Sequence, residues 1–257
     1  MIKQEPYPIL ELDNISDTVI DIGRNIDSDK PLPERCVISF FGEAVKEYVS
    51  KNNCRQIGSL KLETFVLPIY EIVVRNEQIA LIHALGSGPY AAGQIEKLSA
   101  MGSNTFMVCG GCGVLEKGSK CGDIYVPASA VRDEGTSYHY VAPSREIEMN
   151  HGVCDKICAY LIEHAIPYKR VKTWTTDAMY RETADMIEMR KREGCSIVDM
   201  ECASFFAVAQ QKNLKLGQIF YAGDDLSSKK WDSRNWKSNF GARGYLLALS
   251  IGIILSL

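Results

Sequence analysis

Short apolar runs bounded by turn residues alternate along the chain with stretches whose apolar positions recur at helical spacing. This alternation is typical of an α/β layered fold, in which helices cover a central sheet. The apolar runs predict strands at 36–41, 65–74, 79–85, 105–109, 123–131, 168–174, 196–199 and 218–222. The helical patterns predict helices at 43–52, 89–101, 145–164, 180–193, 200–213 and 238–257.

No internal repeat, low-complexity tract or linker rich in Pro and Ser interrupts the 257 residues, so a second domain has no boundary. A chain of this length with 46% hydrophobic residues can bury one large core. We expect a single α/β domain at 36–257, with residues 1–35 as an N-terminal extension packed on it.

Charge and cysteine content narrow the functional classes. The net charge is −3 with both signs mixed along the chain, so we expect neither a nucleic acid nor a membrane as partner. The first residues, MIKQEPYPILELDN, lack the pattern of a signal peptide, and the apolar run 245–257 is shorter than the ~20 residues of a membrane span. Nine cysteines, an odd number, are typical of a reducing compartment, and we expect a cytoplasmic protein.

Residues 105–115, TFMVCGGCGVL, contain a CxxC pair, Cys109 and Cys112. A structural zinc site needs a second ligand pair, and Cys154 and Cys158 lie on an apolar helix pattern that is more typical of core packing. A redox pair would open a helix, whereas this pair follows a strand and leads into a predicted loop. We therefore expect no metal.

The glycines of this stretch suggest a role for the backbone instead. Gly110, Gly111 and Gly113 follow the predicted strand, and without side chains their N–H groups could approach an anion or a sugar. The spacing fits neither a dinucleotide-binding fingerprint nor a phosphate-binding GKS/GKT loop. On this interpretation the cysteines are incidental.

Four further segments are expected to end a strand or to begin a helix, where open α/β sheets gather their ligand sites. They are GSGP at 86–89, TTDAMY at 175–180, VDMECAS at 198–204 and YAGDDLS at 221–227. Together they resemble the trimeric and hexameric nucleoside phosphorylases, which include uridine phosphorylase and bacterial purine nucleoside phosphorylase. The most specific element is Asp199, Met200 and Glu201, and the resemblance extends from about residue 36 to the end.

The resemblance implies a single-domain three-layer sandwich with a central mixed β-sheet flanked by helices. It implies an enzyme of nucleoside salvage, a pentosyltransferase that uses phosphate to cleave a ribonucleoside reversibly into free base and ribose 1-phosphate. Phosphate would be a co-substrate, without any metal or organic cofactor. It also implies a homo-oligomer, either a hexamer or a dimer.

Carried over residue by residue, the resemblance places ribose contacts at Asp199, Met200 and Glu201. The Glu201 carboxylate would accept hydrogen bonds from the 2′ and 3′ hydroxyls, and Met200 would pack on the sugar. In close relatives an N-terminal histidine of a neighbouring subunit contacts the ribose, but this chain has no histidine before His83. His83 stands ahead of the glycine turn at 86–89 and would reach the ribose instead. The plain alternatives are a carboxylate that complements a helix dipole and a structural histidine.

The base subsite would contain Met179, Tyr180 and Asp224. Met179 stands where phenylalanine is usual, and with Tyr180 it would stack on the base. A protonated Asp224 would donate to purine N7 as the base leaves, although Asp225 is an alternative acid and an Asp-rich turn is the plain interpretation.

The anion subsite departs most from the family pattern. Its candidates are Gly42, Lys46, Gly110 and Gly111. Lys46 and Val108 replace arginines that usually hold phosphate, and Gly111 replaces a serine or threonine. Arg132 and Arg181 lie beside motifs and would be the available substitutes.

The preferred base and the nucleophile remain open from the residues alone. Segment 181–186, RETADM, lacks the Gln-x-Arg that reads uracil, which favours purine, whereas SYHYVAP at 137–143 resembles the uridine enzymes. The missing arginines leave room for a nucleosidase, in which Glu43 or Glu47 would activate water. A nucleoside-binding protein without turnover is the alternative from another class.

Overall fold

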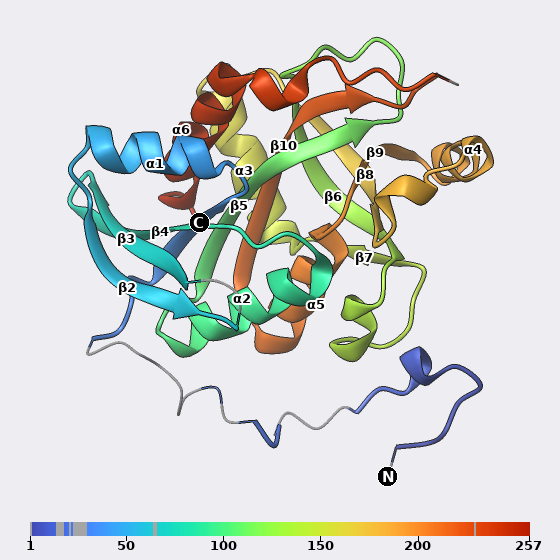
Figure 1. Ribbon diagram of the computed structural model, residues 1–257, viewed down its shortest axis with the longest axis horizontal. Helices are drawn as coiled ribbons and strands as arrows, with labels where there is room; N and C mark the ends of the chain where they lie inside the picture. Colours follow the sequence, from blue (N-terminus) through green and yellow to red (C-terminus); the bar gives the residue numbers. More distant parts are fainter. Residues whose placement is uncertain (1, 14–17, 21, 23–29, 64–65, 229) are drawn as a thin grey trace.

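The computed structural model describes residues 2–13, 18–20, 22, 30–63, 66–228 and 230–257, and its sheet contains two sets of parallel strands (Figure 1). One set runs through β4 (Glu77–His83), β1 (Arg35–Ser39), β5 (Thr105–Val114) and β10 (Lys215–Asp225). The other set contains β6 (Ile124–Asp133), β8 (Lys169–Thr176) and β9 (Cys195–Asp199). The sets are antiparallel where they meet, at the pairs β10 with β6 and β5 with β9.

Strand β5 pairs with both β9 and β10, so the strands β5, β10, β6, β8 and β9 close into a ring. Beyond the ring, the sheet continues from β5 through β1 and β4 to a hairpin of β3 (Val66–Val74) and β2 (Arg55–Lys61). The short strand β7 (Glu146–Glu148) pairs with β6. The sheet is thus mixed, as predicted.

Helices cover the sheet on two sides (Figure 1). On one side lie α1 (Gly42–Lys51), α3 (His151–Glu163) and α6 (Phe240–Ile254). On the other side α2 (Gly88–Ala100) packs beside α5 (Cys202–Lys212). Helix α4 (Ala184–Arg192) lies at one end of the molecule, where it packs on β9 (Figure 1). The predicted three-layer sandwich is confirmed.

The apolar C-terminal run forms α6, whose buried residues Leu246, Leu247, Ile251, Ile253 and Ile254 join the main core. Burial of these side chains is the dominant favourable contribution to packing this helix on β5 and β1. Within the described part of the chain, no helix combines the length and apolar composition that crossing a membrane requires.

Two predicted helices begin later than expected, because local capping sets their first turns. The helix predicted at 145–164 begins at His151, after β7 has paired with β6, and Asn150 Oδ1 accepts a hydrogen bond from Val153 N. The helix predicted at 180–193 begins at Ala184, where Thr183 accepts from Met186 N. Strand β2 was not predicted, since RQIGSLK is a largely polar sheet edge. The first residue of the strand predicted at 65–74 lies outside the described residues.

The prediction that the glycines after Cys109 form a loop was wrong, because β5 continues through them to Val114. The glycines make room for aromatic rings: a β-carbon at Gly110 would lie 3.0 Å from Phe40 Cδ2, and one at Gly111 would lie 3.2 Å from Tyr221 Cε1. On one edge, β5 pairs with β10. On the other, pairing with β1 ends at Cys109 and pairing with β9 begins at Gly113.

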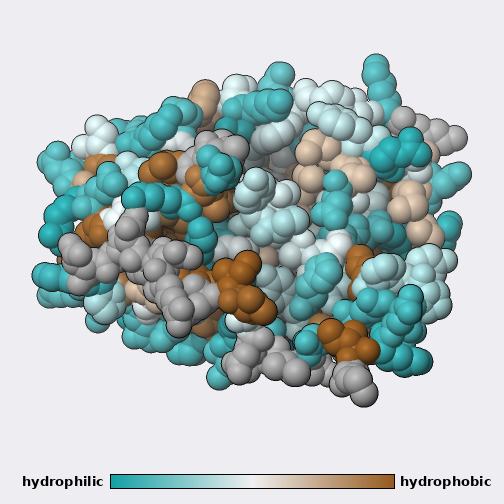
Figure 2. Space-filling view, turned by 60° about the horizontal axis from the view of Figure 1, so that its bottom comes forward, coloured by the Kyte–Doolittle hydropathy of each residue, from teal (hydrophilic) through white to brown (hydrophobic). Residues whose placement is uncertain are grey.

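In the N-terminal segment, the turn η1 (Pro8–Leu10) contacts the turn η3 (Thr136–His139). Ile9 Cδ1 lies 3.6 Å from the position of a β-carbon at Gly135. On the face shown in Figure 2, exposed hydrophobic residues form small separate groups among hydrophilic ones. The domain boundary at residue 35 stays a prediction.

Candidate active site

The candidate site lies where β5 and β9, one strand from each parallel set, overlap near their C-terminal ends. Between Cys109 and Gly113, β5 has a strand partner on one edge only, because β1 has ended and β9 has not begun. Val198 of β9 pairs with Gly113, so the start of α5 lies close to the end of β5. Diverging strand ends of this kind form the crevice in which α/β sheets bind ligands.

Glu201 occupies the junction between two helix N-termini. It is the N-cap residue of α5, but its half-buried carboxylate does not cap that helix. Instead, Glu201 Oε1 accepts a hydrogen bond of 2.7 Å from the backbone N–H of Ser87, directly before α2. Burial, together with the charge of Asp199, raises the Glu201 pKa to about 8. The backbone N–H of Met200 also bonds to this carboxylate. Because a carboxylate has about four acceptor sites, Glu201 can still accept hydrogen bonds from a ligand.

Ser87 adopts a backbone conformation that is rare outside glycine, with φ 87° and ψ 146°. Conformations in this region cost about 1–3 kcal/mol and occur where the surrounding structure imposes them, often at functional sites. Here the strained backbone directs the Ser87 N–H to Glu201, while the Ser87 carbonyl accepts the Ala91 N–H in the first turn of α2.

Asp199 is a positioning residue in this structure. Its carboxylate accepts four hydrogen bonds, from the hydroxyls of Thr173 and Thr175 and from the backbone N–H groups of Glu201 and Cys202. Asp199 therefore caps α5 and leaves the Glu201 side chain free for another task. Its pKa is raised to about 6 by burial, against the effect of these hydrogen bonds. The predicted contact of Asp199 with ribose would compete with all four bonds. Met200 stands between the two acids.

A further acid near Glu201 was missed by the sequence analysis. Asp177 follows β8, and its Oδ2 accepts a hydrogen bond of 2.8 Å from Gly135 N. Its negative charge contributes to the raised Glu201 pKa. The neighbouring Glu134 is buried and accepts hydrogen bonds from Ser137 N and from Ser204 Oγ, which ties η3 to α5. Asp177 lies in the quoted TTDAMY segment, but only the fold shows that it lies near enough to Glu201 to affect its pKa.

Three of the predicted residues meet at the start of α1. A β-carbon at Gly42 would lie 3.1 Å from His83 Nε2, so the imidazole rests against the first residue of this helix. Burial lowers the His83 pKa, and the charge of Lys46 lowers it further, although a hydrogen bond to the Phe40 backbone opposes the shift. Lys46 is exposed and pairs with Glu43 at 3.3 Å. Gly42, Lys46 and His83 thus form one corner, with an imidazole whose charged form is disfavoured and an exposed lysine.

Gly110 and Gly111 face the same region from the unpaired edge of β5. The Phe40 ring covers Gly110 and the Tyr221 ring covers Gly111. A ligand can therefore contact the two glycines only at backbone groups on the unpaired edge of β5. The two substitutes for the missing arginines contribute less. The Arg132 guanidinium is buried and donates to Ser137, Val141, Ala142 and Ser144. Arg181 ends the turn η4 and is exposed.

The structure distinguishes the two acids at the end of β10. Asp225 is held by an ion pair with Arg234 and by the backbone N–H of Ser227, and the Arg234 interaction helps to lower its pKa. Asp224 forms neither contact: its Oδ2 accepts from Trp231 Nε1 at 2.7 Å, and its Oδ1 lies 3.6 Å from a β-carbon position at Gly113. Asp224 therefore faces β5 and the site, whereas Asp225 serves the loop.

The predicted base contacts lie on η4 (Met179–Arg181), between β8 and α4. Met179 is 47% exposed and Tyr180 is 93% exposed, so any cover for these side chains must come from a ligand or another molecule. The next residue, Glu182, was not singled out from the sequence. It is half-buried, receives no hydrogen bond from a described residue, and has its pKa raised to about 7 by burial and by the charge of Asp224.

The cysteines of the CxxC pair do not converge. Cys109 and Cys112 are both buried in β5, and residues three apart in a strand point to opposite faces. Cys112 Sγ donates to Tyr221 O, whereas Cys109 lies near Ser39 and Ser250. Burial raises the pKa of both thiols. This arrangement suits neither a shared metal ion nor a disulfide between them.

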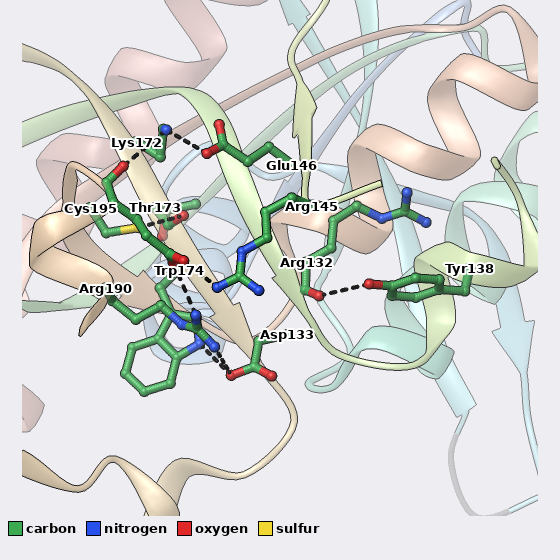
Figure 3. Close-up of polar contacts among 11 residues, drawn as sticks. Arg132, Asp133, Tyr138, Arg145, Glu146, Lys172, Thr173, Trp174, Arg190 and Cys195 are labelled. Atoms are coloured by element: carbon green, nitrogen blue, oxygen red, sulfur yellow. Dashed lines mark hydrogen bonds and ion pairs between the residues drawn. The ribbon is translucent and has the colours of Figure 1, made fainter. Parts of the chain in front are cut away.

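A buried polar network holds the elements beside the site in place (Figure 3). Arg190 of α4 pairs with Asp133 at 2.9 Å and with Glu193 at 3.0 Å, and its guanidinium lies 5.3 Å from the ring centre of Trp174. Trp174 Nε1 donates to the same Asp133 oxygen at 2.9 Å. The network joins α4, β6 and β8, and these strands lead directly to Glu134 and Asp177.

A family model described as the Phosphorylase superfamily matches residues 34–243, and the chain belongs to this family. A guanosine phosphorylase from Halorubrum lacusprofundi is 26% identical over 161 residues, which span 58% of this chain and 67% of that protein. Among solved structures, a purine nucleoside phosphorylase from Toxoplasma gondii in complex with immucillin-H superposes with a TM-score of 0.73 at 18% identity, covering 88% of this chain and 92% of that one.

An AMP nucleosidase from Bacteroides thetaiotaomicron superposes with a TM-score of 0.70 at 19% identity, covering 87% of this chain and 88% of that one. Names of both phosphorylases and nucleosidases therefore occur among the similar structures. At these identities the structural likeness establishes the fold. It does not distinguish phosphate from water as the nucleophile.

Proposed function

We propose that this protein is a nucleoside phosphorylase that cleaves purine ribonucleosides into the free base and ribose 1-phosphate. The observation that carries the proposal is Glu201, a half-buried carboxylate between two helix N-termini. The backbone N–H groups of Ser87 and Met200 hold it, and its remaining acceptor sites are open to a ligand. A carboxylate placed in this way can accept hydrogen bonds from two neighbouring hydroxyls, which only a ribose presents among common nucleoside parts. Met200 supplies the adjacent apolar surface.

The two ends of the substrate follow from the groups on either side. Asp224 and Glu182 lie on the side of η4, where a protonated acid can donate to purine N7 as the glycosidic bond breaks. Gly42, Lys46 and His83 lie at the start of α1, beside the open edge of β5. Free backbone N–H groups at a helix start, together with one lysine, suit a phosphate dianion.

A phosphate oxygen would bond to C1′ of the ribose as the bond from C1′ to N9 breaks with its electron pair to the base. The proton from Asp224 then neutralises the purine, and ribose 1-phosphate stays beside Glu201. No metal or organic cofactor is required by this scheme. We extend the proposal to a cytoplasmic homo-oligomer. In such an assembly a neighbouring subunit would cover the Tyr180 side chain, which is almost fully exposed in the single chain.

Hydrolysis is the second candidate, because the arginines that would hold phosphate are missing. Val108 is fully buried in β5, and Arg132 is fully occupied by the segment after η3. Among the described residues, the cations near the start of α1 are Lys46, which pairs with Glu43, and Arg243, whose guanidinium lies 5.7 Å from the ring centre of Phe41. Arg243 already donates to Tyr221 Oη and to the Trp236 carbonyl, and a lysine holds an oxyanion less specifically than a bidentate guanidinium.

The deciding experiment is release of free base from guanosine, inosine, adenosine, uridine and methylthioadenosine, with and without phosphate. We expect release from purine nucleosides that depends on phosphate and forms ribose 1-phosphate. Release of free ribose at the same rate without phosphate would assign the protein as a nucleosidase. Binding of a nucleoside without release in either buffer would contradict both candidates and support a binding protein.

A further inference from the structure

Asp224 has one hydrogen-bonding partner among the described residues, and it is an unusual one. Trp231 Nε1 donates to Asp224 Oδ2 at 2.7 Å, although Trp231 is 61% exposed. An exposed indole N–H can bond to water at no cost, so its place on the carboxylate needs a local cause.

The local cause is the closure of the loop that carries Trp231. Asp225 and Asp232 exchange two backbone hydrogen bonds of 2.8 and 3.0 Å, which join the two ends of the loop. The Asp225 carboxylate also binds Arg234 and Ser227 N. All of these contacts use Asp225 and none uses Asp224. The loop is therefore closed independently of Asp224, and its closure places Trp231 next to that carboxylate.

The direction of this hydrogen bond decides where a proton on Asp224 can reside. In a carboxylic acid the carbonyl oxygen is the better acceptor, and the hydroxyl oxygen carries the proton. Because Trp231 donates to Oδ2, the protonated form with its hydroxyl at Oδ1 keeps this bond. Oδ1 is the oxygen that faces Gly113 at the end of β5, on the side of the site.

We propose that Trp231 is a positioning residue that fixes the acidic proton of Asp224 on the oxygen facing the leaving base. This inference rests on the proposed function. In the step concerned, the bond from C1′ to N9 breaks with its electron pair to the purine, a phosphate oxygen bonds to C1′, and the Oδ1 proton moves to N7. Trp231 itself neither gains nor loses a proton.

The test compares guanosine with 7-methylguanosine, whose ring is already cationic and leaves as a neutral base without a proton from the enzyme. Trp231→Phe keeps an aromatic ring and removes the N–H. We expect kcat for guanosine to fall on the order of 10- to 100-fold, within the usual contribution of general acid catalysis. For 7-methylguanosine we expect kcat within about twofold of the wild type, because that step needs no acid.

Trp236→Phe is the matched control, since Trp236 lies in the following turn and stacks with Arg243, and no hydrogen bond among the described residues joins its indole to Asp224. It should leave both substrates unaffected. Asp224→Asn should show the same selective loss as Trp231→Phe, because it removes the acid itself. Because Trp231 is exposed, we expect Trp231→Phe to fold like the wild type. Thermal unfolding of each variant checks this.

Equal losses on both substrates, or unchanged kcat on both, would overturn the role of Trp231. Absence of guanosine cleavage by the wild type would instead overturn the proposed function.

Discussion

The Glu201 carboxylate depends on two residues that never need to touch a substrate. Asp199 caps α5 with four hydrogen bonds, and Ser87 donates its backbone N–H from a strained conformation. Asp199 caps α5 in place of Glu201, and Ser87 fixes the position of the Glu201 carboxylate. At the scale of single residues, the site therefore consists of one carboxylate and the groups that hold it in place.

Glu201→Ala should lower kcat/KM by about 30- to 1,000-fold, which corresponds to about 2–4 kcal/mol of lost charge-assisted hydrogen bonding in the transition state. The measurement is steady-state base release from the preferred nucleoside. Glu188→Ala is the control, because that exposed carboxylate of α4 pairs with Lys191. Unchanged kcat/KM in Glu201→Ala would remove the residue from the mechanism.

Glu201→Gln should stabilise the protein at high pH. The Glu201 pKa rises from an ordinary 4.5 to about 8 on folding, so the folded protein keeps a proton that the unfolded chain releases in this window. Stability therefore falls as pH rises from 4.5 to about 8. The neutral amide avoids this loss, on the order of 2 kcal/mol after allowance for solvent at a half-buried site. Urea unfolding at pH 5 and pH 9 measures the difference, which should be small at pH 5.

At the scale of elements, β5 controls the shape of the site. Its glycines leave room for aromatic rings and for aliphatic side chains of neighbouring segments. Its unpaired edge between β1 and β9 forms the crevice. The same strand carries two buried cysteines that face opposite ways. The two cysteine side chains therefore contribute to core packing, whereas the β5 backbone shapes the site.

Gly113→Ala should destabilise the protein by about 1–3 kcal/mol, as is usual for overpacking. A β-carbon there would lie 2.7 Å from Leu226 Cδ1 and 2.8 Å from Val198 Cγ1, so both neighbours must move. Gly93→Ala in the interior of α2 is the matched control: it meets nothing within 4 Å and should stabilise by about 0.5–1 kcal/mol. Denaturant unfolding of the two variants should show opposite signs.

Ser87→Gly should stabilise the protein by about 1 kcal/mol, because glycine adopts a φ of 87° without strain and only part of this gain is lost to unfolded-state entropy. Activity should persist, since the N–H that binds Glu201 remains. Ser87→Ala keeps the strain and should match the wild type in thermal unfolding. A large loss of kcat in both variants would assign a role to the Ser87 hydroxyl instead.

At the scale of the whole molecule, polar contacts beside the site join strands of one parallel set to the helices that pack on them. The Arg190 network joins α4 to β6 and β8, and these strands carry Asp133 and lead to Asp177 (Figure 3). Glu134 binds Ser204 and so joins the ring of strands to the layer of α5. The acids of the site are aligned by this shared frame.

Arg190→Ala should lower the free energy of unfolding by about 2–4 kcal/mol, because it leaves the paired acids Asp133 and Glu193 without their buried partner. Arg192→Ala, two residues further on the exposed face of α4, should change stability by less than about 0.5 kcal/mol. Equilibrium unfolding in urea compares the two. Similar stabilities would show that the network is not needed for folding.

Local patterns were sufficient for the elements whose stability is local. The alternation of apolar runs with helical spacing predicted the layered α/β fold, and the C-terminal run predicted α6. The glycines after Cys109 could not be placed in the same way. Whether they form a loop or a strand depends on β10 and β9, which supply the pairing edges from more than eighty residues away.

The sequence by itself determined the layers, the order of elements and the identity of Glu201 as a candidate, since these depend on periodicity and on one compact motif. Only the tertiary structure separated Asp224 from Asp225, added Asp177 and Glu182, and showed that Asp199 is already bonded. The physical reason is that a side chain's protonation and availability depend on what folding places beside it. Burial and hydrogen-bond partners come from distant strands, and no local pattern contains them.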